Sequence, residues 1–254
     1  MHIRQRNHDH TGDIPYTPLS GSQVILSLSC LPAHADEFPK TVSYNRFVER
    51  QARVVLHLLL FLQTCALGKC TGISIIDSTP LVSCHIRRMH MHRTMKGWAA
   101  REKCTMGWFY GFKPHLVIND KGEIIQWRLT PGNTDDRDQL KDSRFTEKLF
   151  GKILADRGYI SHTLFERLFV DDIHLVTRIG KNMKNSLMNL HDRLLLRKRS
   201  VIETVNDELK NVCQTGHTRH RSIDNFVTNL PAGLIAYNLL PKKPSMNLEI
   251  IEVA

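Results

Sequence analysis

The sequence lacks the features that mark exported and membrane proteins. Its first ten residues are polar and contain no apolar signal segment. The longest apolar run, Val54 to Leu62, is interrupted by His57 and is too short to cross a bilayer. We therefore expect no membrane partner, and we expect this run to form a core helix.

A cysteine framework is also missing. The six cysteines form no Cys-x-x-Cys pair and no regular spacing, so a disulfide scaffold is not predicted. Cys84, His85, His90 and His92 lie close together in sequence, but their spacing matches no structural zinc pattern. In a chain without an export signal such cysteines are expected to be reduced thiols, which predicts a cytoplasmic protein.

Acidic residues are outnumbered by basic ones. The 254 residues include 35 Lys and Arg against 25 Asp and Glu, giving a net charge of +10 and a pI near 9.5. A charge of this size attracts polyanions, so nucleic acid is the first partner to consider. Hydrophobic residues make up 41% of the chain, which is enough to build a core and argues against a disordered protein.

Hydrophobic periodicity predicts a mixed α/β domain. Apolar residues recur at helical spacing from Tyr44 to Leu67, whereas residues 1–36 show no sustained period. Strand-like and helix-like segments follow. Strands are predicted at 73–76, 108–118, 123–129, 153–155 and 174–179, and helices at 161–170, 200–212 and 226–240. This order predicts a mixed sheet flanked by helices.

Two aspartates share the same setting in this predicted sheet. Asp77 and Asp156 each follow a short apolar strand. Neighbouring strands would bring the two carboxylates together, and such a pair ionises fully only with a cation between them. Magnesium suits oxygen ligands of this kind. The alternatives are local: a helix cap for Asp77, followed by Ser-Thr-Pro, and turn chemistry for Asp156 beside Gly158.

A third carboxylate is a candidate on the late helix. Glu203 lies at the border of the apolar stripe, and Asn206 and Lys210 share its helix face. Asp207 and Glu208 are nearby rivals, and the pattern alone does not choose among the three acids.

These residues resemble the DDE transposases of bacterial insertion sequences, whose catalytic core has a ribonuclease-H-like fold. Two segments, Ile76-Asp77-Ser78-Thr79 and Ala155-Asp156-Arg157-Gly158-Tyr159, carry the strand-borne aspartates. The third feature is the spacing of Arg199, Glu203 and Lys210, which follows the signature that such enzymes write as Y-R-E-K. Leu196 stands at the tyrosine position. The resemblance selects Glu203 over its two rivals.

The sequence is most similar to insertion-sequence family nine-eight-two. The similarity runs over residues 69–74, 106–113, 115–120 and 217–222, and it covers roughly 37–247. It implies a short helical N-terminal region (37–70), a ribonuclease-H-like catalytic domain (71–242) and a tail (243–254). Residues 1–36 do not fit the family, which indicates a poorly ordered or unrelated segment and an N-terminally truncated copy.

The resemblance also implies a chemistry. Asp77, Asp156 and Glu203 would be catalytic and would hold two Mg²⁺ ions, with Mn²⁺ as a substitute. The enzyme would cleave the ends of an insertion sequence and join them to target DNA, acting as a homodimer or larger assembly on the terminal inverted repeats, in the nucleoid. Two alternatives stay open: a nuclease of the same fold without strand transfer, and an inactive remnant that binds DNA.

Basic residues supply the expected DNA contacts. Phosphate contacts position DNA without reading its sequence. The predicted DNA-binding residues are Arg199, Lys210, Arg87, Arg88, Arg219 and Arg221. Trp98, Trp108 and Trp127 could stack on a flipped base, but core packing is the favoured interpretation for each.

Overall fold

The computed structural model describes residues 44–178, 188–216, 220 and 222–248. Their N-terminal part is one helical run that confirms the helix predicted from Tyr44 to Leu67. It consists of α2 (Tyr44–Gln51), η2 (Ala52–Val54), α3 (Val55–Phe61) and η3 (Leu62–Ala66). The prediction for residues 1–36 lies outside the described residues, as do Arg219 and Arg221.

A seven-stranded mixed sheet forms the centre of the described chain. Its strands are β1 (Ile73–Ser78), β2 (Leu81–Cys84), β3 (Ala100–Cys104), β4 (Gly107–Asn119), β5 (Ile124–Pro131), β6 (Gly151–Ala155) and β7 (Ile173–Thr177). The long strand β4 pairs antiparallel with β1, β2, β3 and β5. Strands β1, β6 and β7 run parallel to one another. The predicted mixed sheet is confirmed.

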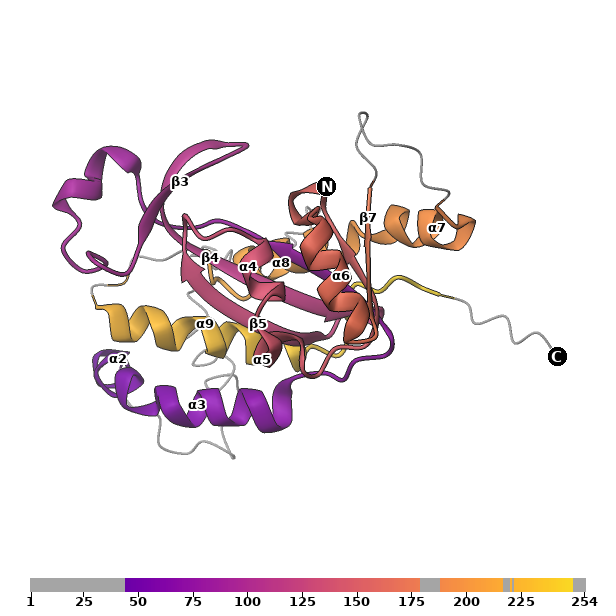
Figure 1. Cartoon of the computed structure of the whole chain (residues 1–254). Helices are drawn as coiled ribbons and strands as arrows, with labels where there is room; N and C mark the ends of the chain where they lie inside the picture. The colour runs from indigo at the N-terminus through magenta and orange to yellow at the C-terminus, as the bar shows by residue number, and fades with distance from the viewer. Residues whose placement is uncertain (1–43, 179–187, 217–219, 221, 249–254) are drawn as a thin grey trace, which may run out of the picture.

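Helices cover both faces of this sheet (Figure 1). They are α4 (Arg137–Leu140), α5 (Ser143–Thr146), α6 (His162–Val170), α7 (Leu190–Lys198), α8 (Val201–Asn211) and α9 (Ile223–Asn238). Side chains alternate along each strand, so Ile75 packs with α3, α7, α8 and α9, while Ile76 packs with α4, α5 and α6. This alternation turns the next residue, Asp77, toward the face that α8 covers.

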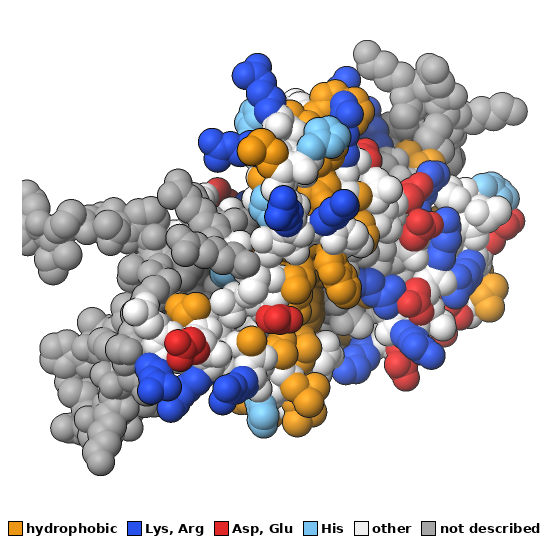
Figure 2. All heavy atoms as spheres, turned by 90° about the vertical axis from the view of Figure 1, so that its left-hand side faces the viewer, with side chains coloured by type: hydrophobic (Ala, Val, Ile, Leu, Met, Phe, Trp, Pro, Cys, Tyr) orange, Lys and Arg blue, Asp and Glu red, His pale blue; other side chains and the backbone are white. Residues whose placement is uncertain are grey.

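We call residues 81–106 the basic arm. The sequence patterns predicted no helix or strand in this segment. The arm contains β2, the 3₁₀ segment η4 (Ile86–Met91) and β3, in which exposed Arg101 and Lys103 break any apolar pattern. Figure 2 shows Lys, Arg and His side chains gathered over this arm, at the top of the face. Trp98 in the arm and Trp108 after it are 62% and 52% exposed, so the expectation of core packing was wrong for these two. It is confirmed for Trp127, which is partly buried and packs against the core.

Two predicted absences can be compared with the described residues. No helix among them is long and apolar enough to span a membrane. Five of the six cysteines are described, and all five are free thiols, as expected from the sequence.

Candidate active site

Asp77 and Asp156 lie at the same level of the sheet. Parallel strands β1 and β6 pair Ile75 with Leu154, and extending that register by two residues sets Asp77 beside Asp156. Asp77 is inside β1, so the alternative of a helix cap is wrong. Asp156 follows β6 and its side chain makes no capping hydrogen bond to the short 3₁₀ turn η5 (Arg157–Tyr159). Neither aspartate is therefore explained by local capping.

Glu203 reaches the same place from helix α8. Arg199 lies in the chain between α7 and α8. Its guanidinium contacts one oxygen of each of the three acids. Its Nη1 lies 3.7 Å from Asp77, and its Nη2 lies 4.0 Å from Asp156 and 3.4 Å from Glu203. We call Asp77, Asp156 and Glu203 the carboxylate triad. Three acids that are far apart in sequence thus surround one cation.

The two rival acids on α8 do not join this cluster. Asp207 accepts a hydrogen bond from Asn211 at 2.6 Å, on the exposed side of the helix. Within the part of the chain that the structure describes, Arg199 forms ion pairs with the triad but not with Asp207 or Glu208. Of the three acids, Glu203 is therefore the one that shares the ion pairs of Arg199 with the two aspartates.

Asp77 is the least solvated member of the triad. Its side chain is 22% exposed, against 57% for Asp156 and 64% for Glu203. Burial raises the pKa of Asp77 to about 6; Arg199 opposes this shift, and Asp156 and Asp136 add to it. A carboxyl group with this pKa is ionised only in part at mildly acidic pH, and a nearby cation would favour its charged form.

Asn206, which the sequence placed on the helix face of Glu203, contacts Asp77, and this contact was not predicted. It is buried on α8, and its Nδ2 donates a hydrogen bond to Asp77 Oδ2 at 3.0 Å. Its Oδ1 is also buried and has no hydrogen-bond partner among the described residues. The spacing of three residues from Glu203 puts both on one helix face, and that spacing was the only signal available in the sequence.

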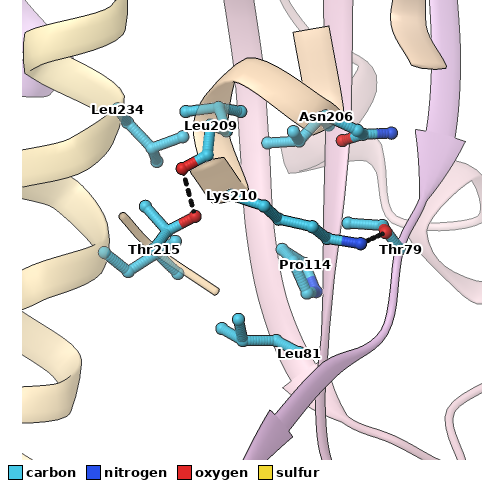
Figure 3. A pocket seen from close by; sticks show the side chains of 10 residues that line it. Thr79, Leu81, Pro114, Asn206, Leu209, Lys210, Thr215 and Leu234 are labelled. Atoms are coloured by element: carbon cyan, nitrogen blue, oxygen red, sulfur yellow. Dashed lines mark hydrogen bonds between the residues drawn. The ribbon is translucent and has the colours of Figure 1, made fainter. Parts of the chain in front are cut away.

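Lys210 extends the site toward the end of β1. Its Nζ donates a hydrogen bond to Thr79 Oγ1, and both side chains line a small pocket (Figure 3). The pocket is otherwise mostly apolar and includes Leu81, Pro114 and Leu234. Burial lowers the pKa of Lys210, while Asp77 and Asp207 oppose the shift. The predicted phosphate-binding lysine thus lies beside the triad, turned toward the protein.

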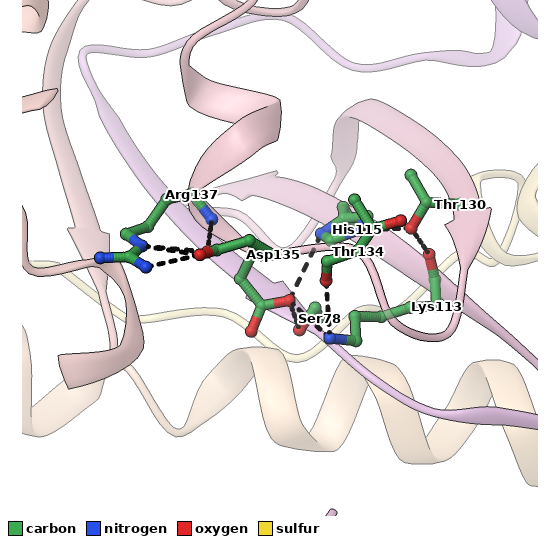
Figure 4. Close-up of polar contacts among 8 residues, drawn as sticks. Ser78, Lys113, His115, Thr130, Thr134, Asp135 and Arg137 are labelled. Carbon is green, nitrogen blue, oxygen red and sulfur yellow. Dashed lines mark hydrogen bonds and ion pairs between the residues drawn. The ribbon is translucent and has the colours of Figure 1, made fainter. Parts of the chain in front are cut away.

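A fourth carboxylate, Asp136, lies behind Asp77. It accepts a hydrogen bond from Ser78 Oγ at 2.8 Å and pairs with Lys113 Nζ at 3.2 Å. The fully buried His115 lies 3.9 Å away, and burial lowers the pKa of this histidine to about 4, so its ring is neutral near pH 7. Figure 4 shows Ser78, Lys113 and His115 converging at this point. Asp136 is neutralised by Lys113 and was not predicted from the sequence.

The triad's donors fit a hard divalent cation, because all of them are carboxylate oxygens. The guanidinium of Arg199 lies between them. No group of three or more His, Cys, Asp or Glu side chains within the described ranges is close enough to hold a metal ion directly.

The structure describes two of the four remaining predicted DNA-binding residues. Arg87 and Arg88 are exposed on η4 in the basic arm. Arg219 and Arg221 fall outside the described residues.

Comparison with known structures gives remote similarities. A chain of the simian T-cell lymphotropic virus intasome in complex with PP2A regulatory subunit B56 gamma is 13% identical, with 91% of this chain and 76% of that chain covered and a TM-score of 0.39. The Mos1 strand transfer complex is 11% identical, with 86% and 71% covered and a TM-score of 0.27. The catalytic domain of Mos1 mariner transposase is 12% identical, with 78% and 93% covered and a TM-score of 0.25. No curated protein sequence matches the chain significantly.

Because these TM-scores are low, the assignment rests on the sequence family. Residues 67–223 match the family described as Transposase DDE domain, and this span contains the whole carboxylate triad. The strand order and the family together confirm the predicted ribonuclease-H-like fold. The chain belongs to the transposase DDE domain family, and with it to the enzymes of DNA transposition.

Proposed function

We propose that Asp77, Asp156 and Glu203 are the catalytic acids of this transposase and that together they hold two Mg²⁺ ions, with Mn²⁺ as a substitute. The family uses divalent metal ions. The observation that carries the assignment is that one guanidinium lies within 4.0 Å of all three carboxylates. Three carboxylates that surround one cation, the guanidinium of Arg199, can also bind a metal cation.

The chain's own residues would set the geometry of the reaction. The two aspartates are fixed by the parallel strands β1 and β6, and Glu203 is fixed by the packed helix α8. The hydrogen bond from Asn206 holds the orientation of the Asp77 carboxylate. When bound, the metal ions would activate a water or a DNA 3′-hydroxyl and stabilise the leaving oxygen.

The proposed substrate is the DNA of an insertion sequence. The triad would serve both the cut at an element end and the joining of that end to target DNA, and no covalent link to the protein is required. Arg87 and Arg88 extend the positive surface along the basic arm, where they would contact phosphates. Two copies of the chain on paired inverted repeats would act together.

The test is cleavage of a DNA duplex that carries one end of the element. Its sequence is to be taken from inverted repeats sought in the DNA that flanks the gene. We expect Glu203→Gln to reduce cleavage by roughly 100-fold or more, because the metal ions contribute several kcal/mol and each 1.36 kcal/mol is about a factor of ten. Asp207→Asn, on the same helix but outside the cluster, should retain activity. Equal losses in both variants would contradict the assignment of the triad.

A second substrate separates the alternatives. With a pre-cut end, a transposase joins the 3′-hydroxyl to target DNA, whereas a nuclease of the same fold does not. A protein that binds DNA but performs neither step, and whose DNA binding is unchanged by Glu203→Gln, would be the inactive remnant.

A further inference from the structure

Arg199 occupies an unusual position for an arginine paired with acids. Its side chain is only 13% exposed, yet its contacts to the triad are 3.4–4.0 Å long, and only the contact with Glu203 is a hydrogen bond. Nη1 is buried and donates no hydrogen bond within the described part of the chain. The guanidinium is therefore shared among three carboxylates without being firmly bound to any of them.

Another arginine of the same protein shows what a firm pair looks like. Arg137 donates hydrogen bonds of 2.5–3.1 Å from Nε and Nη2 to the two carboxylate oxygens of Asp135 (Figure 4). Short bidentate pairing of this kind is the strong form of the interaction. Arg199 has three acids within reach and uses none of them in this way, which indicates that its charge matters more than a specific bond.

We propose that Arg199 is an exchangeable counter-ion that couples metal binding to DNA binding. This inference rests on the proposed metal site. The guanidinium offsets the mutual repulsion of the triad. A divalent cation at the same oxygens would repel the guanidinium and release it.

The position of Arg199 explains where the released side chain would go. Nη1 is buried, but Nη2 faces Asp156 and Glu203, which are both largely exposed, so this arm of the guanidinium borders the solvent side of the site. A planar guanidinium fork matches the geometry of a phosphate group. Metal binding would thus free a phosphate-binding group, and a phosphate that holds Arg199 would free the carboxylates for metal. Such coupling is reciprocal by thermodynamic necessity.

The experiment uses the full chain, Mn²⁺ and a mixed-sequence DNA duplex. Mn²⁺ affinity is measured by the electron paramagnetic resonance of the free ion, and DNA affinity by fluorescence anisotropy at constant ionic strength. For the unaltered protein we expect Mn²⁺ to raise DNA affinity by at least about fivefold, which is the lower end of typical coupling. An unchanged DNA affinity would overturn the proposal without any variant being needed.

Arg199→Gln supplies the second measurement. This variant should bind Mn²⁺ several-fold more tightly than the unaltered protein, and its DNA affinity should no longer respond to Mn²⁺. Arg137→Gln removes the same charge outside the triad and should behave like the unaltered protein. Weaker or equal Mn²⁺ binding in Arg199→Gln would show that the arginine positions the acids and does not compete for them.

Asp77→Asn and Glu203→Gln separate this inference from the proposed function. Both should weaken Mn²⁺ binding if the triad holds the metal. Failure of both to do so would remove the metal site itself. Weakened binding in both, together with an unchanged Arg199→Gln, would remove only the role of the arginine.

Discussion

Replacing Asp77 by asparagine should stabilise the fold near neutral pH while abolishing activity. The pKa of this carboxyl group is raised from 3.8 to about 6, chiefly by burial. Below about pH 4 the group is protonated in both the folded and the unfolded chain, so it has no effect on stability there. Between these two values the folded protein holds the proton more tightly, and stability falls as pH rises. Above pH 6 the ionised carboxylate destabilises the folded state by the full amount.

The pKa shift sets the size of the expected effect. At about 1.4 kcal/mol for each pH unit, the ionised Asp77 carboxylate destabilises the folded state by up to about 3 kcal/mol. Asp77→Asn removes this penalty but also takes one partner from Arg199, so the gain in the free energy of unfolding will lie below that bound. In a chain of this size each kcal/mol corresponds to about 2–4 °C in melting temperature.

The assay is urea unfolding at pH 8 and at pH 4, with EDTA present to keep metal ions away from the acids. Asp77→Asn should be more stable than the unaltered protein at pH 8 and equal to it at pH 4. Asp156→Asn is the matched control, because the 57% exposed side chain of Asp156 is already solvated. A loss of stability at pH 8 in Asp77→Asn, or a gain that is the same at both pH values, would refute the reasoning.

Two other predictions concern the surroundings of the triad. Asn206→Ala removes a hydrogen bond to the Asp77 carboxylate, and such a bond is worth about 1.5–3 kcal/mol. In a carbon-13 NMR titration the pKa of Asp77 should therefore rise roughly one to two pH units above 6. Asn211→Ala, which breaks the surface contact with Asp207, should leave the pKa of Asp77 unchanged. The double substitution Arg87→Gln and Arg88→Gln in the basic arm should weaken DNA binding for all sequences and make the slope of log affinity against log salt shallower by about one for each lost phosphate contact. An unchanged salt slope would remove the arm from the DNA interface.

The parts of the fold that the sequence predicted are those with a strong local signal. A helix was expected over residues 161–170, and α6 runs over His162–Val170, with the Ser161 hydroxyl accepting from the Leu164 amide at its start. The Asn119 turn joins β4 to β5 because the Asn119 side chain accepts from two backbone amides within the turn. Such features depend on neighbours in the chain. Strand β3, with its alternating charges, and α7 gave no comparable signal.

The sequence by itself determined the family, the mixed α/β class and the identity of three candidate acids, because motifs and periodicity are local properties of the chain. It could not determine that Asp136 lies behind Asp77, that Asn206 holds it, or that Arg199 contacts all three acids at once. These contacts join β1 to the loop after β5 and to helix α8. All three segments are far apart in the sequence. Only the packing of helix α8 against the parallel strands brings them together, and burial at that junction, rather than residue type, decides which carboxylate is hardest to ionise.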